Sequence, residues 1–409
     1  MNDVWTPPPI KPLSEYEVDE RTGFLPSEEP SKKLPVYYHE WEAIIDKLPE
    51  LIANKEIRKR VDNLPLLEVS QVKLKTKAEW WRAYIVTTFI GQAYIWMNQD
   101  DTEVMQSVPR SIAIPWCKVS NYLDMPPVVT YSTACLYNWG LHDPQKPPST
   151  DNLYSLITYT GLKDEQWFYI VLLLTEIAAA PGIKAVVEAY RAIERNDKQS
   201  LAENLKIVKL SIEQIIRVLK LYHTPGHCRP RQFYHQIRRF QRGTNQTDGK
   251  HPEGYHPNGL KYEGVDPQPE ACNGASAIQS STIPVFDIFL GVEHTGEELD
   301  FLRKQRKYMP PPHREFLETL EKQNSVRLYI KESNNQELMQ NFDDIVATLH
   351  KFRTSHMKQL VQRFILEQMA PEEKAGATGT AGTKLKVFLT KVRDDTPKAK
   401  VSVHKAHLQ

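Results

Sequence analysis

The sequence predicts an all-α protein with a small N-terminal helical domain and a larger C-terminal helical domain. Long segments at residues 80–97, 199–222 and 333–369 place apolar side chains at steps of three and four. That spacing is the period of a helix with one buried face. No segment alternates apolar and polar residues over a length that would indicate a sheet. With 409 residues, the chain is long enough for two or three domains.

The N-terminal part is expected to contain an arm and a small domain. Residues 1–33 are rich in proline and charge, so we expect an extended, loosely held arm. Residues 34–150 are expected to form the small helical domain and a linker, with helices over 37–54 and 80–97. The proline- and lysine-containing stretch 143–151 is the best candidate for the linker.

The large domain is expected to span residues 151–393. Its first part predicts three successive helices, at residues 166–180, 182–195 and 199–222. Residues 244–269 are heavy in glycine, proline and asparagine and predict a long loop, and loops of that length in compact domains tend to be functional. The basic stretch 394–409 is expected to be a flexible tail.

Composition narrows the class of partner and the compartment. Lysine plus arginine (52) nearly cancels aspartate plus glutamate (51), so we expect neither nucleic acid nor a membrane as partner. The longest apolar run, 167–174, is far shorter than a bilayer span, and the N-terminus lacks the pattern of a signal peptide. The four cysteines are scattered singly, which argues against a disulfide framework and fits a reducing cytosol.

His356 lies on the apolar stripe of the helix predicted over residues 333–369, where histidine is unusual. Ser333, with Gln336 three residues later, forms a capping-box pattern that predicts the start of this helix. A neutral imidazole on such a face can bind iron or another metal through one ring nitrogen while a hydrogen bond holds the other. Arg353, one turn earlier, could then pair with an acidic group such as a haem propionate. A lone histidine in this position is more often an ordinary core residue.

Two other motifs do not carry the chemistry they suggest. The glycine-rich segment 376–383 has neither the P-loop spacing nor the dinucleotide-binding fingerprint. His223, His227 and Cys228 could be imagined as zinc ligands, but Pro225 and Gly226 break the helix that would align them.

Several arginines surround Phe233 and could in principle stack on nucleic-acid bases. Because the chain has no net basic charge, a partly solvated helix is the simpler interpretation, with Arg239 facing solvent. Arg238, five residues after Phe233, could instead turn inward. The ring and the guanidinium would then hold an aromatic acid by its flat face and its carboxylate.

Taken together, these stretches resemble the indoleamine 2,3-dioxygenases. Matching phrases occur in order at residues 16–19, 22–25, 48–52, 108–110, 126–128, 138–139, 176–180, 262–264, 276–281, 286–287, 308–311, 352–356 and 379–383. The resemblance implies a two-domain, all-helical fold with haem b in the large domain. It implies that His356 is the proximal ligand of the haem iron and that Arg353 meets a propionate.

The resemblance also implies roles in substrate binding. Phe168 would lie over the distal side of the haem, and Phe233 would pack on an indole ring. Arg238 would pair with the substrate carboxylate. Tyr131 and Ala134 would line the inner indole pocket. The simpler alternative is that Phe168, Phe233 and Tyr131 are ordinary core aromatics.

A second group of residues is implied to shape the pocket around the cofactor. The backbone from Gly274 through Ser276 to Ala277 would line the distal side, where a side chain larger than that of alanine would crowd the substrate. Asp287 would support the Arg353 network, although a surface or capping carboxylate is the simpler alternative. Thr380 would close over the substrate as part of a mobile lid.

The function implied is a cytosolic, haem-dependent dioxygenase that converts L-tryptophan and O2 to N-formylkynurenine, the first step of the kynurenine pathway. It would need an unidentified electron donor to keep the iron ferrous, and a monomer is expected. Leu172 departs from the family, in which a small or hydroxylated residue is usual. The alternatives are a haem oxygen-storage protein of the molluscan myoglobin type on the same fold, and a low-activity paralogue with a signalling role.

Overall fold

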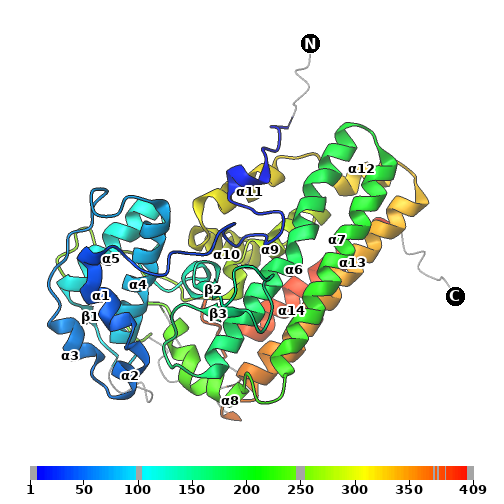
Figure 1. Ribbon diagram of the computed structural model, residues 1–409. Helices are drawn as coiled ribbons and strands as arrows, with labels where there is room; N and C mark the ends of the chain where they lie inside the picture. The colour runs from blue at the N-terminus through cyan, green and yellow to red at the C-terminus, as the bar shows by residue number, and fades with distance from the viewer. Residues whose placement is uncertain are drawn as a thin grey trace.

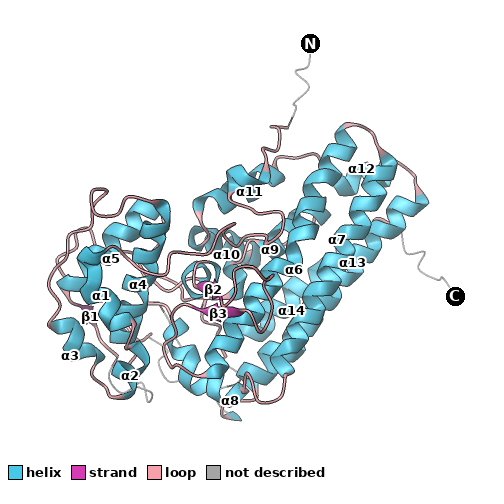
Figure 2. Ribbon diagram, in the orientation of Figure 1, coloured by secondary structure: helices cyan, strands magenta, loops and turns pink. Residues whose placement is uncertain are grey.

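The computed structural model describes residues 7–97, 104–245, 254–371, 374, 377–382 and 384–402. The predicted all-α class is confirmed, because helices make up most of the described chain (Figure 2). Strands in this part form only two short pairs. β1 (Ser107–Val108) pairs in parallel with β4 (Lys261–Tyr262), and β2 (Trp139–Leu141) pairs antiparallel with β3 (Leu153–Ser155).

The first five helices gather at one side of the molecule (Figure 1). They are α1 (His39–Ile45), α2 (Leu48–Ala53), α3 (Ile57–Asp62), α4 (Lys77–Ile95) and α5 (Arg110–Leu123). The single helix expected over 37–54 is two helices, and Pro49 lies in the first turn of the second, where its missing N–H is not needed. α4 begins at a capping box formed by Thr76 and Glu79, and buried residues surround it.

Three long helices form the frame of the other side and run next to one another (Figure 1). They are α6 (Lys163–Glu194), α7 (Lys198–Leu219) and α13 (Gln336–His356). The prediction of two helices separated near Pro181 was wrong, since α6 continues through this proline. Packing overrides the local preference: Gly182 lets α7 approach closely, and the Ser211 hydroxyl of α7 donates to the Ala178 carbonyl at 2.7 Å.

By length and composition, α6 could cross a membrane. Its most apolar window has a mean hydropathy of 1.9, and no other helix in the described residues passes this test. However, 61% of that window is buried inside the protein. The core helix of a soluble protein has the same properties, so this feature is weak evidence for a membrane span.

Shorter helices complete this side: α8 (Pro230–Gln232), α9 (Thr282–Leu290), α10 (Glu297–Gln305), α11 (Pro311–Glu321), α12 (Val326–Glu332) and α14 (Leu385–Asp395). The cap of α13 is Asn335, whose side chain accepts from the Leu338 N–H at 3.1 Å, so the predicted cap at Ser333 was wrong. After His356 the chain continues as a π-helix over Met357–Leu366. π-helical turns are rare and often occur at functional sites.

The N-terminal segment is not a loosely held arm over its described part. Leu13, Tyr16 and Phe24 are buried, and the ring of Tyr16 lies 5.1 Å from that of Phe316 on α11. Proline richness suggested an extended chain, but the sequence could not show that these apolar side chains fit against the large helical body. The prediction missed burial that only the tertiary structure creates.

The C-terminal segment is likewise held in place as far as residue 402. Thr396, Ala399 and Val401 are buried, and the Val401 N–H donates to Asp343 of α13 at 2.7 Å. The flexible tail expected from residue 394 was therefore wrong up to residue 402, and residues 403–409 lie outside the described chain.

The expected linker at 143–151 is the loop of a hairpin, because it joins the paired strands β2 and β3. The expected long loop at 244–269 contains β4, and its residues 246–253 lie outside the described chain. One continuous cluster of buried apolar residues extends through both sides of the molecule. The division into domains at residue 150 therefore stays a prediction.

Candidate active site

Two adjoining cavities open between α6, α13, the π-helix that follows it and the segments around Ser276 and Thr380. They enclose about 860 Å³ and about 1330 Å³ of empty space, counting their openings to solvent. Both are lined by Tyr131, Leu172, Ser276, Ala277, His356, Leu360, Val361, Gly379 and Leu385. Since these residues come from segments far apart in the sequence, the fold itself builds the site. A pocket of this kind is the first place to look for a ligand site.

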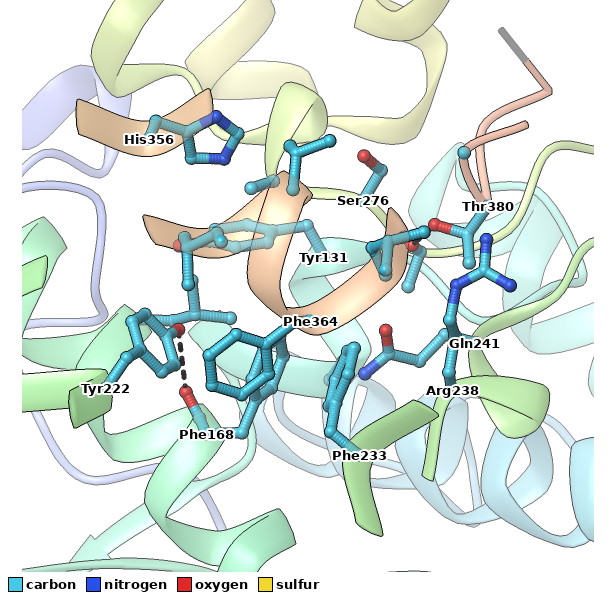
Figure 3. Close-up of a pocket in the computed structure, with 18 of the residues that line it drawn as sticks. Tyr131, Phe168, Tyr222, Phe233, Arg238, Gln241, Ser276, His356, Phe364 and Thr380 are labelled. Atoms are coloured by element: carbon cyan, nitrogen blue, oxygen red, sulfur yellow. Dashed lines mark hydrogen bonds between the residues drawn. The ribbon is translucent and has the colours of Figure 1, made fainter. Parts of the chain in front are cut away.

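His356 is the last residue of α13 and projects into the space between the cavities (Figure 3). Among the described residues it is the only histidine that lines either cavity, and neither ring nitrogen has a hydrogen-bond partner there. Burial lowers the pKa of His356 to about 4, so the imidazole is neutral near pH 7. A neutral ring has a nitrogen lone pair available for a metal. The expected partner for the second nitrogen is absent from the described residues.

An aromatic slot lies across the cavity from His356 (Figure 3). The rings of Phe168 and Phe233 stack with centroids 4.3 Å apart, and Phe364 approaches Phe233 edge-on at 5.8 Å. The Tyr222 hydroxyl donates to the Phe168 carbonyl at 3.1 Å. These contacts fix a flat, apolar surface of the kind on which an aromatic ligand packs.

Leu172 and Ala134 also face this space. Leu172 lies one turn after Phe168 on α6 and lines both cavities, whereas Ala134 lines the smaller one. The spacing of four residues places Phe168 and Leu172 on the same face of the helix. The expectation that Leu172 faces the pocket is therefore consistent with the structure, and its effect on activity stays a prediction.

The opposite end of the slot is polar. The Arg238 guanidinium lines the smaller cavity and donates from Nη2 to the Thr378 carbonyl at 2.8 Å. Gln241, one turn later, lines the same cavity. The Thr380 hydroxyl donates to the Ala275 carbonyl at 2.6 Å. This end presents a cation, an amide and a hydroxyl to any ligand whose ring fills the slot.

Gly274 does not line either cavity, unlike the three residues that follow it, so its expected place in the pocket wall was wrong. A Cβ at Gly274 would lie 2.0 Å from the Gln241 carbonyl oxygen and 2.5 Å from the Gly243 nitrogen. Glycine is needed there for contact between two backbone segments. The Gly274 N–H also donates to the Thr380 carbonyl at 3.0 Å, which ties the Thr380 segment to the cavity wall.

Arg353 and Asp287 form a buried ion pair at the edge of the larger cavity, which both residues line. The two carboxylate oxygens accept from Arg353 Nη2 at 2.8 and 2.6 Å, and Arg353 also donates to the Thr396 hydroxyl. Burial acts to raise the pKa of Asp287, but Arg353 and His294 outweigh it and the pKa is lowered. Asp287 is therefore an ionised partner of Arg353 and not a surface carboxylate.

Arg239 is buried, with its guanidinium 4.5 Å from the centre of the Phe240 ring. The expectation that it faces solvent was wrong. A π-helical turn over Phe233–Ile237 followed by a 3-10 turn changes the direction of successive side chains, and helical spacing alone cannot show this.

Sequence reasoning missed several residues of the site. Glu176 is buried on α6 and accepts from the hydroxyls of Tyr131 at 2.8 Å, Ser280 at 2.6 Å and Thr282 at 2.6 Å. It follows Phe168 and Leu172 at a further step of four, a spacing that could have revealed it. Gln241 carried no such signal, because only the fold brings it to the cavity.

Comparison with known proteins agrees with this arrangement. The family model described as indoleamine 2,3-dioxygenase matches residues 12–399. Indoleamine 2,3-dioxygenase 2 of Mus musculus is 34% identical, covering 95% of each chain. A 6-hydroxytryptophan 2,3-dioxygenase of Fusarium equiseti is 33% identical, over 94% of this chain and 96% of its own. The indoleamine 2,3-dioxygenase of Saccharomyces cerevisiae is 30% identical, over 95% and 93%. The chain belongs to the indoleamine 2,3-dioxygenase family.

Proposed function

We propose that this protein is a haem-dependent dioxygenase that adds both atoms of O2 across the C2–C3 bond of an indole amino acid. L-Tryptophan is the expected substrate and N-formylkynurenine the product. The observation that carries the proposal is a single space that holds a neutral His356 imidazole, a stacked phenylalanine slot and the Arg238 guanidinium. Membership of the dioxygenase family supports the same reaction.

The residues present fit haem b. His356 has a ring nitrogen free to bind the iron, and the larger cavity has an apolar lining that suits a porphyrin. Arg353, anchored by Asp287, lies at the edge of this cavity and would meet a propionate carboxylate. When bound, haem supplies the ferrous iron that binds and activates O2.

The protein's own contribution is to hold the indole in a reactive position. Phe168 and Phe233 would fix the plane of the ring, and Arg238 would fix the amino-acid end by pairing with its carboxylate. Positioning of this kind removes much of the entropic cost of bringing two reactants together. The Thr380 segment, bonded to Ala275, would cover the substrate and exclude water.

No cavity side chain in the described residues is suited to act as a base near pH 7. Burial raises the pKa of Tyr131 well above its ordinary value, so its hydroxyl stays protonated and donates to Glu176. His356 would be occupied by the cofactor. The pocket therefore holds and orients its ligands and leaves the bond-making to the indole and O2.

Leu172 bears on how efficient the reaction is. A bulky apolar side chain there narrows the slot and leaves the indole N–H without a polar neighbour on that side, at a cost of roughly 1–3 kcal/mol. A relative named for 6-hydroxytryptophan shows that the family includes enzymes for substituted indoles. The dioxygenase names of the relatives favour an enzyme over the oxygen-storage protein and the signalling paralogue.

The direct test is anaerobic reduction of the purified haem protein, followed by addition of O2 with and without L-tryptophan. The proposal expects formylkynurenine only when tryptophan is present. Stable, reversible O2 binding with no product would instead identify an oxygen store. We also infer a monomer in the reducing cytosol with an unidentified electron donor, and the four free cysteines support that compartment. Size-exclusion chromatography tests the oligomeric state.

A further inference from the structure

His294 is a buried histidine that the proposed reaction does not use. It lies between α9 and α10 and lines neither cavity. Its Nδ1 is 3.1 Å from an oxygen of Asp395, and its Nε2 is 3.7 Å from an oxygen of Asp287. Only 5% of the His294 side chain is exposed, against 6% for Asp395 and 14% for Asp287. A buried imidazole placed between two carboxylates is favoured in its charged form.

The charges around His294 do not balance without its proton once an acidic cofactor is bound. The two carboxylates face Arg353, which pairs with Asp287, and Lys398, which lies 2.7 Å from Asp395. Further out, Glu298 and Lys391 form their own pair. Two anions and two cations are neutral together. A carboxylate arriving beside Arg353 adds a third anion, and only a protonated His294 supplies a third cation.

We propose that His294 is a positioning residue for the cofactor, which holds Asp287 and Asp395 and supplies the positive charge that lets this edge accept a carboxylate. The proposal rests on the proposed binding of haem, whose propionates are the carboxylates concerned. His294 would act through Asp287 and Arg353 and not by touching the cofactor. Haem would therefore be held more tightly at a pH where His294 is charged.

The direction of the pH dependence follows from the same contacts. Burial acts to lower the pKa of His294, but the Asp287 and Asp395 carboxylates outweigh it and raise the pKa above its ordinary value of 6.5. A raised pKa means that the charged form stabilises the folded state fully below about pH 6.5. This stabilisation is lost as the pH rises through the higher pKa of the folded protein.

The first experiment measures the rate at which the holoprotein loses haem to an excess of an apoglobin acceptor. For the wild type we expect the rate to rise about tenfold between about pH 6 and about pH 9. His294→Gln should lose haem about tenfold faster at the low end and show little pH dependence. His294→Lys keeps a permanent charge and should retain haem across the range. His39→Gln, at an exposed histidine, is the matched control.

The second experiment needs no haem. Urea unfolding of the haem-free wild type should show stability that falls from about pH 6 to about pH 9, with a smaller fall in His294→Gln. A flat wild-type profile in both experiments, or a His294→Gln profile identical to that of the wild type, would overturn the proposal. A wild type that takes up no haem would contradict the proposed cofactor, while the unfolding profiles would still decide whether His294 carries the linked charge.

Discussion

Replacing Arg238 with alanine tests how the substrate is held. The guanidinium lines the smaller cavity and is partly buried, so its pairing with a substrate carboxylate is incompletely screened by water. Truncating one partner of a buried charge pair costs about 2–5 kcal/mol, and partial exposure places Arg238 in the lower part of that range. A loss of about 2–3 kcal/mol corresponds to a fall in kcat/KM for L-tryptophan of roughly 30- to 160-fold.

The assay compares L-tryptophan with tryptamine, which lacks the carboxylate. If Arg238 binds the carboxylate, Arg238→Ala should lower kcat/KM for tryptophan and leave the much weaker reaction of tryptamine nearly unchanged. Arg238→Lys should fall between the wild type and the alanine variant, because lysine keeps the charge but loses the fork of two donors. Haem content and O2 binding should not change in either variant.

Arg231→Ala is the matched control, since Arg231 is exposed seven residues earlier and lines neither cavity. Arg239 is unsuitable because it is buried. Unchanged tryptophan kinetics in Arg238→Ala would remove Arg238 from the substrate site. Equal losses with tryptophan and tryptamine would show that Arg238 matters only through its bond to the Thr378 carbonyl, which positions the Thr380 segment.

Three further predictions follow from the site. His356→Ala should abolish or greatly reduce haem retention, as seen in the absorption spectrum of the purified protein, because no other described histidine lines either cavity. Leu172→Ser should lower the KM for L-tryptophan and raise kcat/KM several-fold, with little change in O2 affinity. Asp287→Asn should destabilise the protein at neutral pH by about 3–5 kcal/mol, measured by urea unfolding, because Arg353 loses its buried partner. Since the pKa of Asp287 is lowered, this difference should be full above about pH 4 and shrink as the pH falls further.

Each of these has an outcome that contradicts it. A normal five-coordinate histidine spectrum in His356→Ala would mean that another histidine binds the iron. Efficient tryptophan turnover by the wild type, with Leu172→Ser harmful, would show that Leu172 does not crowd the slot. An Asp287→Asn variant as stable as the wild type at pH 7 would mean that Arg353 finds an equal partner in Thr396.

Helix positions were predictable wherever the apolar period was long and uninterrupted. The helices near residues 80–97 and 199–222 are present with small shifts of their ends. Local signals failed where packing opposed them. Pro181 suggested a break, yet α6 continues, and Ser333 suggested a cap that Asn335 provides instead. Such signals are worth about 1 kcal/mol or a few, which contacts with neighbouring helices can exceed.

By itself, the sequence determined the helical class, the apolar stripe that carries His356 and the resemblance that singled out Arg238. These depend on residue type and spacing along one chain, which the sequence contains in full. Only the tertiary structure decided that Gly274 lies behind the cavity wall, that Arg239 is buried and that Glu176 and His294 have buried partners. Burial and charge pairing depend on which distant segments meet, and a carboxylate or histidine gains its unusual protonation only from the neighbours that folding brings to it.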